Sequence, residues 1–132
     1  DTLTFPYTWF HQEKIRRLSG DYQGNNQFCS IFISFYINNE GEHVGHFKTE
    51  NKENIVSNKN IYCEACKNVT GYWYIENDAI AFHPDHSWNN EYFMFNNSST
   101  KLIYKGSKLR HGDTYNSSLC KKDLSLKKLG AL

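Results

Sequence analysis

The central part of the chain shows an alternation of side chains with a period of two. Such a period, with β-branched and aromatic residues, is typical of a β-strand and is found between Phe28 and Ile37. Residues 38–41 read Asn-Asn-Glu-Gly, which favours a turn because Asn and Gly tolerate positive φ. A return strand over 42–48 completes a predicted hairpin. The two sets of alternate positions are Cys29, Ile31, Ile33, Phe35 and Ile37, and Phe28, Ser30, Phe32, Ser34 and Tyr36.

Further strand-like segments follow after a polar, poorly patterned stretch over 49–67, which we expect to form a long loop. Aromatic-rich strands are predicted at residues 71–75, 79–83, 88–95 and 101–105. Strands spaced by about ten residues and joined by polar turns indicate a barrel or a sandwich built from hairpins. The tail after these strands is compatible with a short helix, a last strand or a frayed end.

One helix is expected before the first strand. Thr8 is a candidate N-cap, and His11, Ile15 and Leu18 recur at helical spacing. Gly20 is placed to end this helix. A helix this short is marginal by itself, so we expect it to pack on the β core.

Composition supports a single ordered domain over residues 1–132. Aromatic residues make up 16% of the chain, which excludes the composition of a disordered protein. No apolar run approaches the ~18 residues of a membrane span. The net charge is +1 with both signs interspersed, so no nucleic-acid partner is predicted. The start at Asp1 fits a processed export signal and equally a trimmed chain.

The four cysteines indicate an oxidising compartment, the periplasm or the outside of the cell. Cys63-x-x-Cys66 lacks the following helical pattern of a redox motif, so a structural disulfide is favoured. We predict the pairs Cys29–Cys120 and Cys63–Cys66, because closure of a barrel brings its first and last strands together. The alternative pairings would tie the 49–67 loop to the strands.

The stretch Leu18-Ser19-Gly20-Asp21-Tyr22-Gln23-Gly24 resembles the opening of small bacterial lipocalin-like envelope proteins, of the copper-resistance and envelope-stress outer-membrane lipoprotein type. Residues 71–73 (Gly-Tyr-Trp) and 80–82 (Ile-Ala-Phe) resemble later strands of that family. The family places Cys-x-x-Cys directly after the opening Gly, where this chain has only Cys29. The resemblance implies a lipocalin-like barrel and an envelope location, and it carries over no activity.

Catalytic signatures are not evident in the sequence. There is no Gly-x-Ser-x-Gly elbow and no phosphate-binding Gly-rich loop. His43 and His46, three apart on a strand, face opposite sides, whereas His83 and His86 flank a turn and could converge on a metal. Surface histidines are the favoured interpretation, so we predict no metal, no cofactor and no enzymatic activity. A hydrolase without a recognisable motif is the minority alternative.

Aromatic residues on both faces of the predicted strands are the most unusual feature. A sheet buried on one side normally carries polar residues on the other. Aromatics there indicate an internal pocket, a partner surface, or a cover formed by the N-terminal helix and the long loop. We therefore predict a small antiparallel β-barrel or half-barrel that acts as a non-catalytic secreted or periplasmic binding protein. It would neutralise a protein partner, as an inhibitor or immunity protein does, and the alternative is a lipocalin-like carrier of a small apolar ligand. The predicted binding residues are Phe32, Tyr36, Tyr72, Tyr74 and Tyr92.

Overall fold

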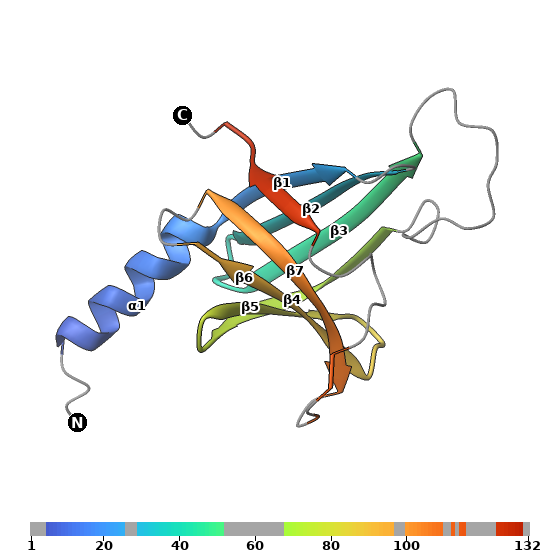
Figure 1. The fold of residues 1–132 in the computed structure, drawn as a ribbon. Coiled ribbons are helices and arrows are strands. Elements are labelled where there is room, and N and C mark those ends of the chain that lie inside the picture. The colour runs from blue at the N-terminus through green and yellow to red at the C-terminus, as the bar shows by residue number, and fades with distance from the viewer. Residues whose placement is uncertain are drawn as a thin grey trace.

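The computed structural model of the chain is a closed barrel of eight antiparallel strands preceded by one helix (Figure 1). The structure describes residues 5–25, 29–51, 68–96, 100–109, 112, 114–115 and 124–130. In chain order the elements are α1 (Phe5–Leu18), β1 (Gly20–Asn25), β2 (Cys29–Ile37), β3 (His43–Asn51), β4 (Asn68–Glu76), β5 (Ala79–Pro84), β6 (Asn89–Phe95), β7 (Lys101–Leu109) and β8 (Ser125–Lys128).

Each strand pairs with its neighbours in the sequence, and the short strand β8 closes the barrel. β8 pairs with β7 on one side and with β1 on the other, where Tyr22 lies opposite Lys128. The strands alternate in direction, which gives the barrel two distinct ends. We call the end with the β2–β3, β4–β5 and β6–β7 turns the helix end, because α1 joins β1 there. The opposite end, with the β5–β6 turn, is called the far end (Figure 1).

The core lies inside the barrel and is rich in aromatic rings. Phe35 is fully buried near its centre, with ring centroids 5.4 Å from Trp73, 5.8 Å from Phe93, 6.2 Å from Tyr22 and 6.4 Å from Phe82. Rings and apolar side chains from all eight strands contribute to this core. The large, fully buried residues are Trp73, Tyr22, Tyr104, Phe35, Phe47, Phe82, Phe93, Leu18, Ile31, Ile33, Ile80 and Leu102, joined by Leu126 of β8.

The last turn of α1 packs on the helix end of the barrel, as expected of a short helix. Leu18 is fully buried, and its carbonyl accepts a hydrogen bond of 2.8 Å from the Tyr22 hydroxyl. The Arg17 carbonyl accepts a second from Lys128 Nζ at 2.7 Å. The N-terminal half of α1 extends away from the barrel (Figure 1). No helix among the described residues is long and apolar enough to cross a membrane.

The structure confirms the predicted fold class and settles its open points. The hairpin of β2 and β3 and the later strands lie where the alternation placed them. The barrel is closed and not a half-barrel, and the tail supplies a last strand. The helix begins at Phe5, earlier than the predicted Thr8. The predicted 49–67 loop lies largely outside the described residues, and its first part, up to Asn51, belongs to β3.

Candidate functional site

An exposed aromatic row crosses the outer wall of β2, β3 and β4. Odd-numbered positions of these strands point inward, so the even-numbered ones face outward. Tyr36 pairs with Val44, and Val44 pairs with Tyr72. Tyr36 and Tyr72 are each 45% exposed. Two of the five predicted binding residues therefore share one cross-strand row on the surface.

The row continues over β4 and β5 as a set of closely packed rings. The Tyr72 and Tyr74 rings are stacked, with centroids 6.2 Å apart and planes inclined by 24°. Tyr72 also packs against the His83 ring, with centroids 4.9 Å apart. We call the exposed surface formed by Tyr36, Tyr72, Tyr74 and His83 the aromatic wall.

A buried amide holds part of the aromatic wall in place. Asn90 is only 2% exposed although it faces outward from β6. Its Nδ2 donates to the Tyr74 hydroxyl at 2.9 Å and to the Tyr92 hydroxyl at 3.4 Å. Because Nδ2 is used as the donor, Oδ1 accepts from His83 Nδ1–H at 2.7 Å. Such a connected polar network fixes the orientation of the rings that it joins.

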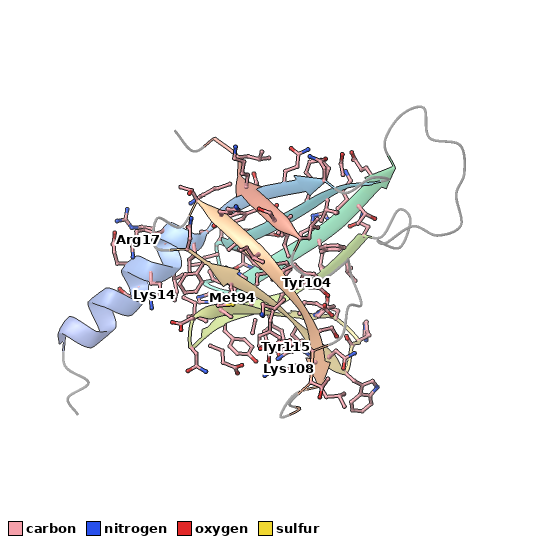
Figure 2. All side chains as sticks on the ribbon, in the orientation of Figure 1. Lys14, Arg17, Met94, Tyr104, Lys108 and Tyr115 are labelled. Carbon is pink, nitrogen blue, oxygen red and sulfur yellow. The ribbon has the colours of Figure 1, made fainter. Side chains whose placement is uncertain are left out.

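Tyr92 lies beside this wall, on the outer face of β6, but it is covered. It is 3% exposed, and the Tyr115 ring packs edge-on against it at 5.6 Å. Lys108 Nζ lies 4.9 Å from both rings, and Figure 2 shows Lys108 and Tyr115 together. Burial raises the pKa of Tyr92. Tyr92 was predicted as a binding residue, but Tyr115 and Lys108 cover it, so its ring is not available on the surface. Phe32, the last predicted binding residue, is half-buried on β2.

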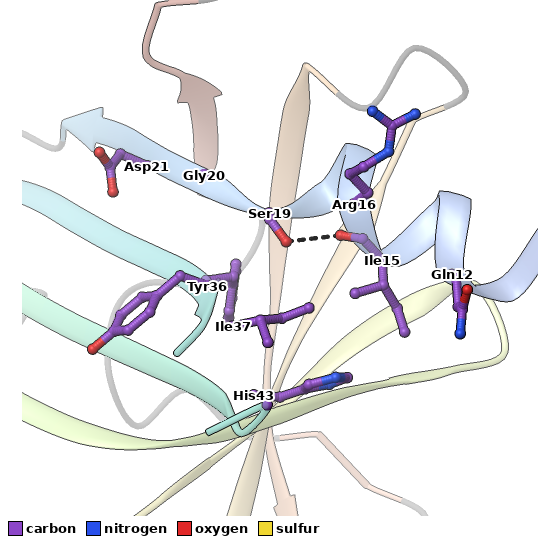
Figure 3. A pocket seen from close by; sticks show the side chains of 11 residues that line it. Gln12, Ile15, Arg16, Ser19, Gly20, Asp21, Tyr36, Ile37 and His43 are labelled. Atoms are coloured by element: carbon purple, nitrogen blue, oxygen red, sulfur yellow. Dashed lines mark hydrogen bonds between the residues drawn. The ribbon is translucent and has the colours of Figure 1, made fainter. Parts of the chain in front are cut away.

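A separate groove opens at the helix end, between α1 and the β2–β3 hairpin (Figure 3). Its volume is about 690 Å³. Ile15 and Ile37 face each other across it, with His43 beside them (Figure 3). The His43 ring packs on Trp73 at 5.0 Å, and Trp73 Nε1 donates to the Tyr36 carbonyl at 3.1 Å. We call this hollow the end groove; it is lined by Gln12, Ile15, Arg16, Ser19, Gly20, Asp21, Phe35, Tyr36, Ile37, Gly41 and His43.

The titratable groups of the described residues do not assemble into a metal site. His43 faces the end groove, whereas His46 is hydrogen-bonded to Asn68 on the outer wall. His83 is held by Asn90, and the exposed His86 lies in the following turn. Within the described part of the chain, no group of three His, Cys, Asp or Glu side chains could hold a metal ion.

One carboxylate of the described residues is buried inside the barrel. Glu91 is 2% exposed and accepts a hydrogen bond of 2.6 Å from the Tyr104 hydroxyl. Both side chains point inward from β6 and β7. This pair satisfies polar atoms within the core, as buried polar groups require.

The predicted disulfides lie outside the described residues. Cys63, Cys66 and Cys120 are not described, and of Cys29 only the backbone is. Cys29 begins β2, whose neighbours are β1 and β3, whereas β8 lies between β7 and β1. The adjacency of first and last strands therefore does not bring β2 beside β8. The pairing of Cys29 with Cys120 stays a prediction without that support.

No family model, curated protein or solved structure matches this chain. The resemblance to envelope lipoproteins thus stays a prediction.

The sequence reasoning missed one prominent surface residue, Trp88. At 87% exposed, it is the most exposed large apolar side chain among the described residues. The sequence contains a signal for it, because Trp88 directly follows the turn residues Pro-Asp-His-Ser. The strand predicted over 88–95 includes Trp88 as its first residue, whereas β6 begins one residue later, at Asn89.

Proposed function

We propose that this protein is a non-catalytic binding protein that engages a protein partner through the aromatic wall. The observation that carries the proposal is the pair Tyr36 and Tyr72, each 45% exposed in one cross-strand row. Tyrosine is enriched among the residues that dominate binding energy in protein interfaces. Its ring contributes large apolar area, and its hydroxyl can still form a hydrogen bond when covered.

The wall is also held ready for binding. Asn90 fixes Tyr74 and His83 by hydrogen bonds, and Tyr72 packs between those two rings. A rigid surface loses less conformational entropy on association than a mobile one. The closed barrel favours recognition through side chains over pairing with a strand of the partner. Closure leaves less unpaired strand edge to which a partner strand could add.

We place this function in the periplasm or outside the cell, and we expect the complex to neutralise the partner, as an inhibitor or immunity protein does. Identifying the partner tests both the expected location and the expected neutralising role. A photoreactive benzoylphenylalanine in place of Tyr36 would trap the partner in extracts of the native source. The matched control carries the same group in place of Ile103, which is 38% exposed on the outer face of β7.

Binding of the trapped partner is then measured with purified variants. Tyr36→Ala and Tyr72→Ala should each weaken binding by about 2 kcal/mol, roughly thirtyfold, if they are central to the interface. Ile103→Ala should bind like the wild type, and circular dichroism should show all three variants folded. Wild-type affinity in both tyrosine variants would contradict the proposal.

The end groove supports a second candidate, a carrier of a small apolar ligand. Its volume of about 690 Å³ lies within the range of small-molecule sites, and Ile15, Phe35 and Ile37 give it apolar walls. Titration with the fluorescent probe anilinonaphthalene sulfonate tests this function. Saturable binding that is lost in Ile37→Lys and kept in Ile103→Lys would favour it; identical binding by both variants would exclude the groove as the site.

A further inference from the structure

The β5–β6 turn presents Trp88 at the far end of the barrel. An indole that is 87% exposed is unusual, because large aromatic side chains normally bury most of their surface. Exposed aromatics of this kind are common anchors in protein association, where they fill a pocket on the partner.

The turn is braced on both sides of the tryptophan. Asp85 N donates to the Thr70 carbonyl at 2.9 Å, and Thr70 Oγ1 donates to Asp85 Oδ2 at 3.1 Å. Ser87 N donates to the Pro84 carbonyl at 3.2 Å, and Asn89 N donates to Ser87 Oγ at 3.1 Å. These bonds attach the turn to β4 and to the start of β6, so the position of Trp88 is set by the barrel.

Backbone strain at His86 also indicates that the turn is held in one conformation. His86 has φ of 62°, in the left-handed region that a residue with a side chain adopts at a cost. Among the described non-glycine residues, only Asn77 shares such a positive φ, and Asn tolerates it better. Strain of this kind persists where the surrounding structure holds it, and the hydrogen bonds of Asp85 and Ser87 flank His86 on both sides.

The same molecule carries a pocket of fitting chemistry at its other end. The end groove has apolar walls of Ile15, Phe35 and Ile37 and an imidazole, His43, for edge or face contact with a ring. Arg16 lies at the groove together with Asp21; its side chain pairs with Glu13 but is still 75% exposed, and the Trp88 turn carries the carboxylate of Asp85. The net charge of +1 gives little repulsion between copies of the chain.

We propose that Trp88 of one molecule inserts into the end groove of a second molecule, so that copies associate head to tail. The two surfaces lie at opposite ends of the barrel (Figure 1), which makes the contact heterologous. Such contacts form rings where the rotation closes and chains where it does not. One aromatic side chain buries about 150–250 Å², far less than a stable interface requires, so the association is weak and reversible.

Sedimentation velocity over a range of concentrations up to about 1 mM tests the proposal. Wild-type protein should show mass growing with concentration beyond the dimer or towards one ring size. Trp88→Ala and Ile37→Lys should each weaken association at least about tenfold. Met94→Ala and Ile103→Lys alter side chains that are also exposed, at 40% and 38%, but lie outside both surfaces, and they should behave as wild type.

A mixing experiment separates this contact from every other kind of association. Trp88→Ala keeps the groove and Ile37→Lys keeps the tryptophan, so an equimolar mixture can form one productive contact per pair. The mixture should give a one-to-one dimer that does not grow further, although each variant alone is monomeric.

Several outcomes would overturn the proposal. They are wild-type protein that stays monomeric throughout, variants that associate as well as wild type, and a mixture that fails to form the dimer while both variants remain folded. Circular dichroism and thermal unfolding check folding. If the groove instead binds a small ligand or another protein, the wild-type protein should stay monomeric throughout.

Discussion

The hydroxyl of Tyr22 offers a quantitative test of how α1 is held on the barrel. Tyr22 is fully buried on β1, and its hydroxyl donates to the Leu18 carbonyl at 2.8 Å. Tyr22→Phe removes this donor and keeps the ring against Phe35. One intramolecular hydrogen bond contributes about 0.5–1.5 kcal/mol net to stability. The free energy of unfolding of the variant should therefore be about 1 kcal/mol lower than that of the wild type near neutral pH.

The same residue predicts an inversion of this effect at high pH. Burial raises the pKa of Tyr22 from 10.0 to about 12. As the pH rises, the unfolded chain therefore loses this proton before the folded chain does. The contribution of the neutral Tyr22 hydroxyl to the free energy of unfolding is fully present below pH 10 and is lost as the pH rises through about 12. Linkage gives a loss of unfolding free energy of about 1 kcal/mol near pH 11 and about 2 kcal/mol near pH 12.

Urea unfolding, followed by tryptophan fluorescence, measures the difference between wild type and Tyr22→Phe from about pH 8 to about pH 11.5. Other groups, including Tyr92 with its raised pKa, titrate in both proteins and cancel in the difference. The wild type should be more stable near pH 8, the two proteins should match near pH 11, and the variant should be more stable above it. A difference that stays constant over this range would refute the reasoning.

Three further predictions follow from particular contacts. A Cβ on Gly71 would lie 2.0 Å from the backbone oxygen of His83, so Gly71→Ala should cost about 3 kcal/mol or more of unfolding free energy. Gly41 has φ of +81° and nothing within 4 Å of its Cβ position, so Gly41→Ala should cost only about 1 kcal/mol. Similar urea midpoints for the two variants would contradict this. Asn90→Ala should cost about 2 kcal/mol of unfolding free energy, because it removes the hydrogen bonds of Asn90 to the Tyr74 and Tyr92 hydroxyls and to His83. Thermal unfolding should show little change for the exposed Asn39→Ala. Digestion without reduction, with peptide mass mapping, should find disulfide-linked peptides, and four free thiols would disprove the oxidised state. The predicted pairs are Cys29–Cys120 and Cys63–Cys66.

Local pattern was sufficient to predict most of the strands. The alternation over β2 placed Ile31, Ile33 and Phe35 on one face, and all three are fully buried inside the barrel. Tyr36 was placed on the opposite face, and it is exposed. Ile37 departs from its set because it ends β2 at the end groove, where it is 46% exposed. These placements require only the period-two alternation of side chains, which can be read from the sequence of one strand.

Tyr92 shows where such reasoning ends. The period-two alternation of β6 puts it on the opposite face from Phe93, which is the outer face. It is nevertheless buried, because Tyr115, more than twenty residues later, packs across it and Ala81 pairs with it on the neighbouring strand. Both neighbours depend on the register of the closed barrel and on the path of the chain after β7. Neither contact has a local signal in the sequence.

The filling of the barrel decides where this protein can bind anything large. An eight-stranded barrel is just wide enough either to be filled by its own side chains or to hold one small ligand. Here the ring of Phe35 and its four aromatic neighbours occupy the centre, and Leu18 of α1 is buried at the helix end. Room for a ligand therefore appears beside α1, in the end groove, rather than along the barrel axis. Since the interior uses its aromatic residues for packing, the binding that we propose relies on the additional aromatics of the outer wall, and Tyr36 belongs to both the wall and the groove.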